Sequence, residues 1–167
     1  MTGTDAEKLI SRAREIDDGA IPSGNSVAAL SLLRMGRLTM DRELENQAQA
    51  TLNAFSSQLA KYPAGYCQMM IALDFTVGPT REIVIAGDES DPKVQAFLRE
   101  IDSHFLPNQV TIFRPLSGEA REKIESLSPF TKNQTALGGQ ATVYVCRNYV
   151  CDLPTNEIEK LKNLLVQ

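Results

Sequence analysis

The chain has 167 residues, of which 43% are hydrophobic and 23% charged, a balance typical of folded globular proteins rather than disordered ones. A net charge of −4 without a basic block argues against a nucleic-acid partner. No apolar run approaches the length that spans a bilayer, and the first residues lack the apolar core of a signal peptide. We therefore expect no membrane partner and a cytoplasmic location.

The number and spacing of the cysteines and the histidine limit the metal and redox chemistry that the chain can support. Three cysteines and one histidine, scattered along the chain, argue against a closed zinc site with four ligands. The odd number of cysteines also argues against a secreted disulfide framework and for a reducing compartment. We therefore expect no metal and no cofactor.

The first part of the chain predicts three helices. Ser23 can cap a helix over residues 23–38, whose apolar residues leave almost no polar face. Apolar residues recur at steps of three or four through residues 41–60, and a third helix is predicted over 65–77. Helices with this much apolar surface need further partners, so we expect the helical region 1–78 to be incomplete.

The period changes at Pro79, and the rest of the chain alternates between strand and helix. Short runs rich in β-branched residues predict three buried strands, at residues 81–88, 108–115 and 141–146. Helices follow these strands, the first capped by Asp91 and the last by Thr155. This alternation predicts a small three-stranded parallel α/β unit over residues 79–167, joined by right-handed crossovers.

The loop DDGAIPSGNS, residues 17–26, joins a polar stretch to the most apolar helix. Four of its side chains can hydrogen-bond a polyhydroxyl ligand at a helix N-terminus, namely Asp18, Ser23, Asn25 and Ser26. The ligand would then be a carbohydrate-like small molecule. The same residue types also explain helix capping and a tight turn, and this second interpretation is favoured.

The stretch VCRNYVC, residues 145–151, places Cys146 and Cys151 five positions apart. They can form a redox pair, half of a metal site, or a small buried corner. A thioredoxin-type pair has two intervening residues rather than four, although a loop of this length can still return far enough for a disulfide. A reducing compartment argues for thiols, so we interpret the pair as a structural corner and leave the disulfide open. Cys151 is expected to be the more reactive thiol, because Arg147 and the helix start at Thr155 would support negative charge there.

Four blocks of the chain, in order, carry a resemblance to a known family: DDGAIPSGNSVAALSLLR, REIVIAGD, FLPNQVTIFRP and YVCRNYVCDLP. They resemble the long spermatogenesis-associated, thioredoxin-domain proteins of bacteria and animals. The resemblance implies a thioredoxin-like domain followed by an (α/α)6 barrel similar to N-acylglucosamine 2-epimerases. The chain would then be only the C-terminal end of such a protein, with three barrel helices packed against the α/β unit. The resemblance also implies an irregular lead-in over residues 9–18, with basic Arg12 and Arg14, where composition alone leaves helix and loop open.

The resemblance implies a non-catalytic C-terminal region that closes the barrel and lines part of its mouth. One alternative is a sugar-isomerase or epimerase-like active site with Asp18, Ser23 and Asn25 as substrate contacts, but the helical region contains no histidine. The other alternative is a thiol redox partner of the missing thioredoxin-like domain, acting through Cys146 and Cys151. Without the missing barrel helices, apolar side chains would stay exposed and favour a homo-oligomer through the helical half, namely Val27, Leu30, Leu33 and Met70.

Overall fold

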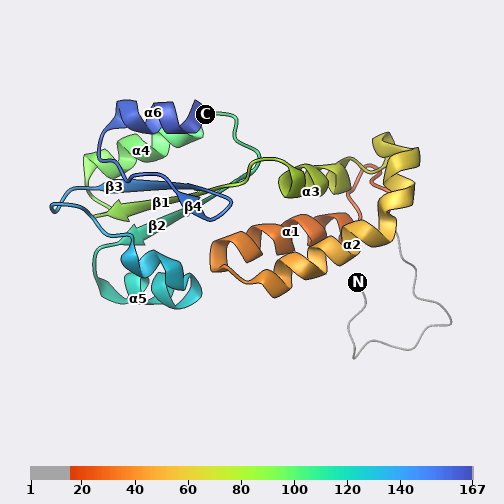
Figure 1. Ribbon diagram of the computed structural model, residues 1–167, viewed down its shortest axis with the longest axis horizontal. Helices are drawn as coiled ribbons and strands as arrows, with labels where there is room; N and C mark the ends of the chain where they lie inside the picture. The colour runs from red at the N-terminus through yellow and green to blue at the C-terminus, as the bar shows by residue number, and fades with distance from the viewer. Residues whose placement is uncertain (1–15, 167) are drawn as a thin grey trace. The chain divides into compact units, whose positions relative to one another are not determined.

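The structure, a computed structural model, describes residues 16–166. These residues divide into two compact units, each described by itself below (Figure 1). The helical unit contains residues 16–36 and 41–77, and the sheet unit contains residues 37–40 and 78–166. Of the predicted irregular lead-in, residues 16–18 form no helix, and residues 9–15 lie outside the described part of the chain.

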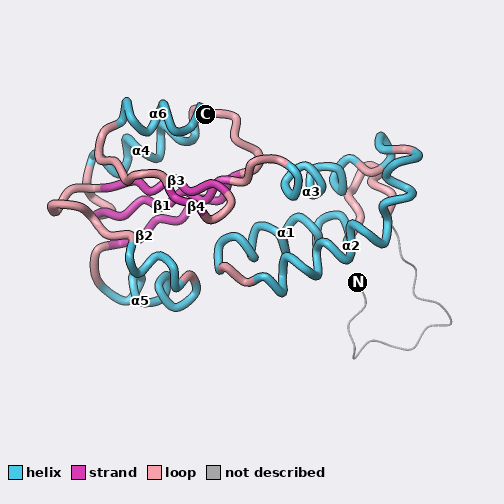
Figure 2. Tube along the Cα trace, in the orientation of Figure 1, coloured by secondary structure: helices cyan, strands magenta, loops and turns pink. Residues whose placement is uncertain are grey.

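Three helices and a short 3-10 turn make up the helical unit (Figure 2). In chain order these are α1 (Gly24–Thr39), α2 (Arg42–Lys61), the turn Pro63–Gly65 and α3 (Cys67–Val77). Ser23 and Asp41 precede the first two helices, and each side chain accepts a backbone N–H from the first turn. The helices lie close to the ranges predicted from the apolar period. The end of α1, residues 37–39, belongs to the sheet unit.

The described residues of the sheet unit form four strands, three helices and a second 3-10 turn. In chain order these are β1 (Arg81–Gly87), α4 (Pro92–Asp102), β2 (Gln109–Pro115), α5 (Gly118–Leu127), the turn Pro129–Asn133, β3 (Thr142–Arg147), β4 (Val150–Cys151) and α6 (Ile158–Val166). The strand order is β2-β1-β3-β4, so β4 lies at an edge. Over residues 16–166, no helix is both long and apolar enough to cross a membrane.

The sheet is mixed and four-stranded, so the prediction of three parallel strands is wrong. β1 and β2 are parallel, but β3 runs antiparallel to β1, with Thr142 opposite Ala86. The reason lies in residues 128–140, which follow α5 and have no predicted element. This segment brings the chain to the end of the sheet at which β1 finishes. β3 therefore starts there and runs in the opposite direction to β1.

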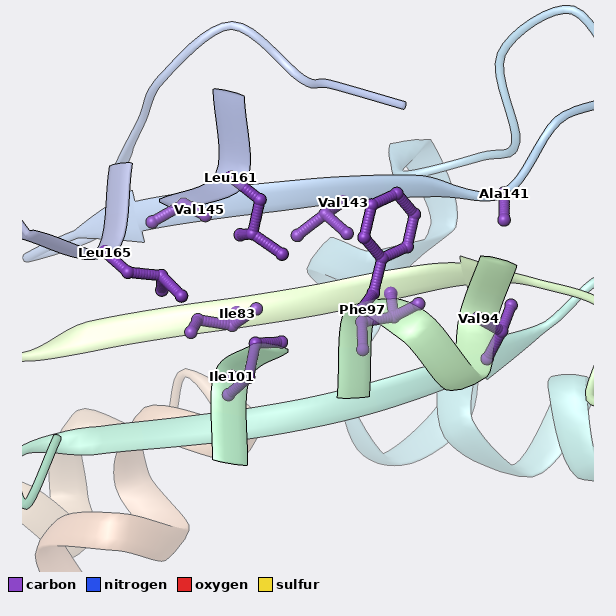
Figure 3. Close-up of a cluster of buried hydrophobic side chains, with 10 residues drawn as sticks. Ile83, Val94, Phe97, Ile101, Ala141, Val143, Val145, Leu161 and Leu165 are labelled. Carbon is purple, nitrogen blue, oxygen red and sulfur yellow. The ribbon is translucent and has the colours of Figure 1, made fainter. Parts of the chain in front are cut away.

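Both faces of the sheet carry a hydrophobic core, as expected for strands that read as continuous apolar runs. α4 and α6 cover one face, where Phe97 and Leu161 belong to the cluster that includes Ile83 (Figure 3). The other face carries a smaller cluster, against which Ile124 of α5 packs beside Tyr144 of β3. Successive side chains of a strand point to opposite faces of the sheet. The face with the smaller cluster therefore carries every second residue of β1 and β3, including Val84, Ala86 and Tyr144.

Charged contacts also fasten α5 to the sheet. Arg114 of β2 and Arg121 of α5 both donate to the carboxylate of Glu125. The hydrogen bond from Arg121 is the main reason that the pKa of Glu125 lies below its ordinary value, although burial acts in the opposite direction. Because α5 has no fully buried residue, these contacts help to hold the segment that leads to the second 3-10 turn.

The helical unit exposes fewer apolar side chains than the sequence predicts. Leu30 and Leu33 are buried, so the described residues already cover half of the predicted patch. Val27 is exposed and Met70 is half-buried. The homo-oligomer and the origin of these helices in a barrel stay predictions.

Candidate functional site

The site is built around the hairpin that joins β3 to β4. Asn148 and Tyr149 form its two-residue turn, and both have a positive φ, of 49° and 68°. Two-residue turns with positive φ at both positions match the twist of the strands, and asparagine adopts this conformation more readily than most residues. The turn sets a register in which Cys146 lies directly opposite Cys151.

The structure joins these two cysteines in a disulfide, with the sulfur atoms 2.00 Å apart. The backbone N–H of Asp152 donates to the carbonyl of Val145, so the adjacent cysteine pair occupies a non-hydrogen-bonded position, where facing side chains come closest. The expectation of two thiols does not hold in the structure. It treated residues 147–150 as a loop, whereas they belong to a hairpin that aligns the two cysteines. Their redox role stays a prediction.

The two sulfur-bearing residues differ in access to solvent. Cys146 lies on the inner strand β3 and is 2% exposed, whereas Cys151 lies on the edge strand β4 and is exposed. An incoming thiolate can therefore reach Cys151 more easily than Cys146. The third cysteine, Cys67, lies in the helical unit as an exposed free thiol.

Arg147 fastens the hairpin to its surroundings. Its Nη1 lies 2.8 Å from Oδ2 of Asp152, and its Nη2 donates to the carbonyl of Leu164 in α6 at 2.7 Å. Burial, and then the charge of Arg147, lower the pKa of Arg81 on the neighbouring strand. The guanidinium therefore already has a carboxylate and a carbonyl as partners, and it is less free to support a thiolate at Cys151 than we expected.

A cavity of about 350 Å³ lies beside the disulfide, on the same face of the sheet as Tyr144. Its apolar and aromatic walls come from Met40, Phe130, Tyr144, Tyr149 and Pro154, next to Cys146 and Cys151. Its polar lining comes from Glu82, Asn133, Gln134 and Asp152. The volume lies within the range of small-molecule sites, at its lower end.

Gln134 connects the cavity to the disulfide. It follows the second 3-10 turn and is 7% exposed. Its side-chain Nε2 donates to both sulfur atoms, over 3.8 Å to Cys146 and 3.9 Å to Cys151. Its Oε1 is buried and receives no hydrogen bond from any residue between 16 and 166. A buried amide oxygen without a donor is costly, so Gln134 keeps its contact with the sulfurs at the expense of an unsatisfied acceptor.

Glu82, a buried residue of β1, forms a hydrogen bond with the hairpin turn. This carboxylate is 2% exposed, and it accepts hydrogen bonds from Nη1 of Arg37 at 3.2 Å and from the backbone N–H of Tyr149 at 3.1 Å. The Arg37 guanidinium also lies 4.5 Å from the centre of the Tyr149 ring, close enough for a cation–π contact. One buried carboxylate therefore fixes the turn that sets the cysteine register.

Neither Glu82 nor Gln134 was predicted as a site residue from the sequence. Glu82 is the one carboxylate inside the apolar run REIVIAG, and a charge in a buried strand indicates a buried partner. Gln134 lies in the segment 128–140, which had no predicted element. No local signal there could place its side chain against the cysteines.

The polar loop forms mainly capping contacts. Oδ2 of Asp18 accepts two backbone N–H groups from the first turn of α3, at 2.9 and 3.1 Å, and its Oδ1 accepts the N–H of Ser23 at 2.8 Å. Oγ of Ser23 accepts the N–H of Ser26 and lies 2.8 Å from the Ser26 hydroxyl. Asn25, half-buried in α1, has an interaction partner as well. These contacts agree with the capping interpretation, and binding of a carbohydrate-like ligand here stays a prediction.

The fold and site together define a mixed α/β unit whose edge hairpin carries a disulfide beside a cavity of small-molecule size. The chain is 33% identical over 165 residues to spermatogenesis-associated protein 20 of Rattus norvegicus, an alignment that covers 99% of this chain and 20% of that protein. The human protein of the same name is 32% identical over 154 residues, which cover 92% of this chain and 19% of that protein. An uncharacterised protein of Caenorhabditis elegans is 27% identical over 159 residues, which cover 95% of this chain and 21% of that protein.

The chain is thus homologous to the C-terminal part of spermatogenesis-associated protein 20, as its resemblance to the family suggested. It spans about a fifth of the length of these relatives. No protein-family model and no solved structure matches the chain.

Proposed function

We propose that the sheet unit is a thiol–disulfide exchange element of a longer protein, with Cys146 and Cys151 as its redox pair. The observation that carries this proposal is the asymmetric disulfide beside a cavity, with Cys151 exposed and Cys146 buried. A disulfide that only stabilised the hairpin would need neither an adjoining cavity nor a buried amide directed at its sulfurs. The sequence alone favoured a structural corner, because it did not reveal either feature.

The chemistry begins with a dithiol reductant. A thiolate of the reductant attacks Sγ of Cys151, a mixed disulfide forms there, and Cys146 leaves as a thiolate that then takes a proton from solvent. The second thiolate of the reductant attacks the reductant sulfur that is bonded to Cys151. The bond between that sulfur and Cys151 breaks, Cys151 leaves as a thiolate, and the reductant becomes a disulfide. Two electrons pass to the cysteine pair. The amide N–H of Gln134 offsets part of the cost of a buried thiolate at Cys146, because hydrogen bonds to charged acceptors are the stronger ones.

The resemblance suggests where the reductant would come from. The family pattern includes a thioredoxin-like domain, which would supply a dithiol within the same longer protein. We propose this domain as the partner of the Cys146–Cys151 pair. The whole protein would then carry its electron donor and acceptor on one chain.

The order of attack can be tested with double substitutions that leave a single thiol. Cys146→Ser and Cys151→Ser, each combined with Cys67→Ser, leave one thiol apiece. We expect the thiol of Cys151 to react with 4,4′-dithiodipyridine at least tenfold faster than that of Cys146, because only Cys151 is exposed. Equal rates, or faster reaction at Cys146, would contradict the proposed mechanism.

A second, non-catalytic role rests on the helical unit. A groove of about 380 Å³ lies between α2 and α3, with Leu52, Leu59 and Leu73 in its lining. We propose that a helix of the longer protein fills this groove, so that the helical unit closes an (α/α)6-type barrel. Hydrogen exchange of α2 and α3 should then be slower in the longer protein than in this chain alone. Equal exchange in both proteins would contradict the barrel-closing role.

A further inference from the structure

We propose that the free edge of β4 binds the electron acceptor of the cysteine pair, a protein disulfide whose cysteine lies in an extended segment directly opposite Cys151. This inference rests on the redox function proposed above, and it names the class of substrate and the surface that binds it. The segment would pair with the edge as an additional antiparallel strand.

The backbone of Cys151 offers one donor and one acceptor to such a segment. Because the N–H of Asp152 donates to the carbonyl of Val145 in β3, the N–H and C=O of Cys151 point the other way, away from that strand. β4 is an edge strand, and neither group has a backbone partner within residues 16–166. A residue of an extended peptide presents a C=O and an N–H on one side, so it can satisfy both groups at once.

The free edge is short, and this limits the register of the peptide. On one side of Cys151, the N–H of Tyr149 already donates to the buried Glu82. On the other side, Pro154 has no N–H to offer. The peptide residue that pairs with Cys151 would have its Cα about 5.5 Å away, within the range of about 4.4–6.8 Å in which two cysteines can form a disulfide. A cysteine at this position is therefore placed to exchange with Cys151.

Apolar side chains flank the position of exchange. Val150 and Leu153 are 75% and 90% exposed, on either side of the exposed cysteine. Leu153 also lines a groove of about 540 Å³, together with Lys160, Asn163 and Leu164 of α6. A peptide with β-branched residues beside its cysteine would cover these side chains and would itself favour the extended conformation.

The donor and the acceptor differ in what they can offer to this edge. The attacking thiol of a thioredoxin-type donor lies at a helix N-terminus, so no extended strand accompanies it. A protein disulfide in an extended segment supplies both the strand and the sulfur. The edge therefore fits the acceptor.

The exchange balances in atoms and electrons. In the reduced protein, the thiolate of Cys151 attacks the peptide cysteine, and the sulfur that was bonded to that cysteine leaves as a thiolate. The thiolate of Cys146 then attacks Sγ of Cys151, the peptide cysteine leaves as a second thiolate, and the disulfide of the structure forms again. The two electrons received from the dithiol thus reduce one protein disulfide to two thiols, which take their protons from solvent.

The test uses the Cys146→Ser variant, in which Cys151 forms stable mixed disulfides. Two acetylated and amidated peptides are compared: Thr-Val-Thr-Cys-Thr-Val-Thr, and the same sequence with an N-methylated cysteine, which cannot donate to the C=O of Cys151. Each peptide is mixed with its own disulfide dimer, and the adducts at Cys151 and Cys67 are measured by mass spectrometry. Cys67, an exposed thiol of the helical unit, corrects for the intrinsic reactivity of each peptide.

We expect the ratio of Cys151 to Cys67 adducts to be about tenfold higher for the unmethylated peptide, since the methyl group removes one hydrogen bond and obstructs the approach to the edge. Leu153→Ser should lower this ratio about threefold through the loss of apolar contact. Phe105→Ser is the matched control and should not change the ratio, because Phe105 is 91% exposed but precedes β2, at the opposite edge of the sheet. Equal ratios for the two peptides would overturn the inference, and so would equal ratios in the two serine variants.

A second measurement depends neither on the folding of the Cys146→Ser variant nor on reduction. Both peptides, with serine in place of cysteine, are titrated into the unsubstituted oxidised protein, and the amide resonance of Cys151 is followed by NMR. The unmethylated peptide should shift this resonance, and the methylated peptide should not. The absence of a shift with either peptide would contradict the inference.

The failure of this inference can be told apart from the failure of the redox function. If the pair is reduced and reoxidised reversibly while neither measurement distinguishes the peptides, only this inference is wrong. If the peptides are distinguished in the oxidised protein but the pair cannot be reduced without unfolding, the redox function is wrong, and the bound segment is not an electron acceptor.

Discussion

At the scale of single residues, two buried polar side chains distinguish this hairpin from an ordinary one. Glu82 binds both the turn and a guanidinium, and Gln134 places an amide against both sulfurs. Each has a cost of burial that only specific partners repay. For Glu82 the partners are present, so its contribution should be to stability. For Gln134, Nε2 has the two sulfurs as acceptors, so its contribution should be to the chemistry of the cysteine pair.

Replacement of Glu82 by Gln should destabilise the protein strongly. The substitution keeps the shape but removes the charge that pairs with Arg37, whose side chain is 14% exposed. Breaking one side of a buried ion pair typically costs about 3–5 kcal/mol, and we expect the lower end because Arg37 keeps some contact with water. Urea unfolding monitored by circular dichroism measures the loss. The control is Glu119→Gln on the exposed start of α5, which should change the free energy of unfolding by less than about 0.5 kcal/mol. Similar values for both variants would mean that the Glu82 contacts contribute little.

At the scale of elements, the hairpin β3–β4 decides the site. Its turn requires two successive residues with positive φ, and only the first of them, Asn148, is a residue type that favours this conformation. The cysteine register therefore depends on a turn that a β-branched residue would oppose.

Substitution at Asn148 tests the turn. Asn148→Val should lower the free energy of unfolding by about 1–2 kcal/mol, because a β-branched residue is strained at a φ of 49°. Asn148→Gly, the matched control, should leave stability within about 0.5 kcal/mol of the parent protein, because glycine adopts positive φ freely. Thermal unfolding of the oxidised proteins gives both values. A valine variant as stable as the glycine variant would show that the turn is not strained in this way.

The elements also show what the sequence could and could not predict. The strand and helix ranges followed from apolar period and caps, as with Asp91, whose side chain accepts the N–H of Lys93. The direction of β3 could not be predicted, because an apolar run reads the same in a parallel and an antiparallel strand. β4 was missed because two residues carry no period. The turn signal, an asparagine between apolar runs, was present at Asn148 but was interpreted as a loop.

At the scale of the whole molecule, the chain spans about a fifth of the length of its relatives. Its helical unit has several exposed apolar side chains. Val27, Met35 and Ile71 are 45%, 51% and 45% exposed. Isolated apolar side chains of this kind are normal, but together with the groove between α2 and α3 they suggest a surface that another helix would cover.

The chain alone should therefore associate with itself at high concentration. We expect light scattering to show a dimer or larger assembly whose formation is reduced by Ile71→Lys, since a charge on this helix face opposes apolar contact. Val150→Lys, on the hairpin of the sheet unit, is the control and should not change the assembly. A monomer at all concentrations would contradict this prediction.

The central claim is that the Cys146–Cys151 disulfide exchanges electrons in the folded protein. The direct measurement is a titration of the native protein with reduced and oxidised dithiothreitol, followed by alkylation and peptide mass spectrometry, with circular dichroism recorded in parallel. Our account predicts that Cys67 alone is alkylated under oxidising conditions, and that Cys146 and Cys151 become alkylated together and reversibly as the reductant increases, without loss of the fold. A pair that is alkylated under all conditions, or that becomes accessible only when the protein unfolds, would contradict it.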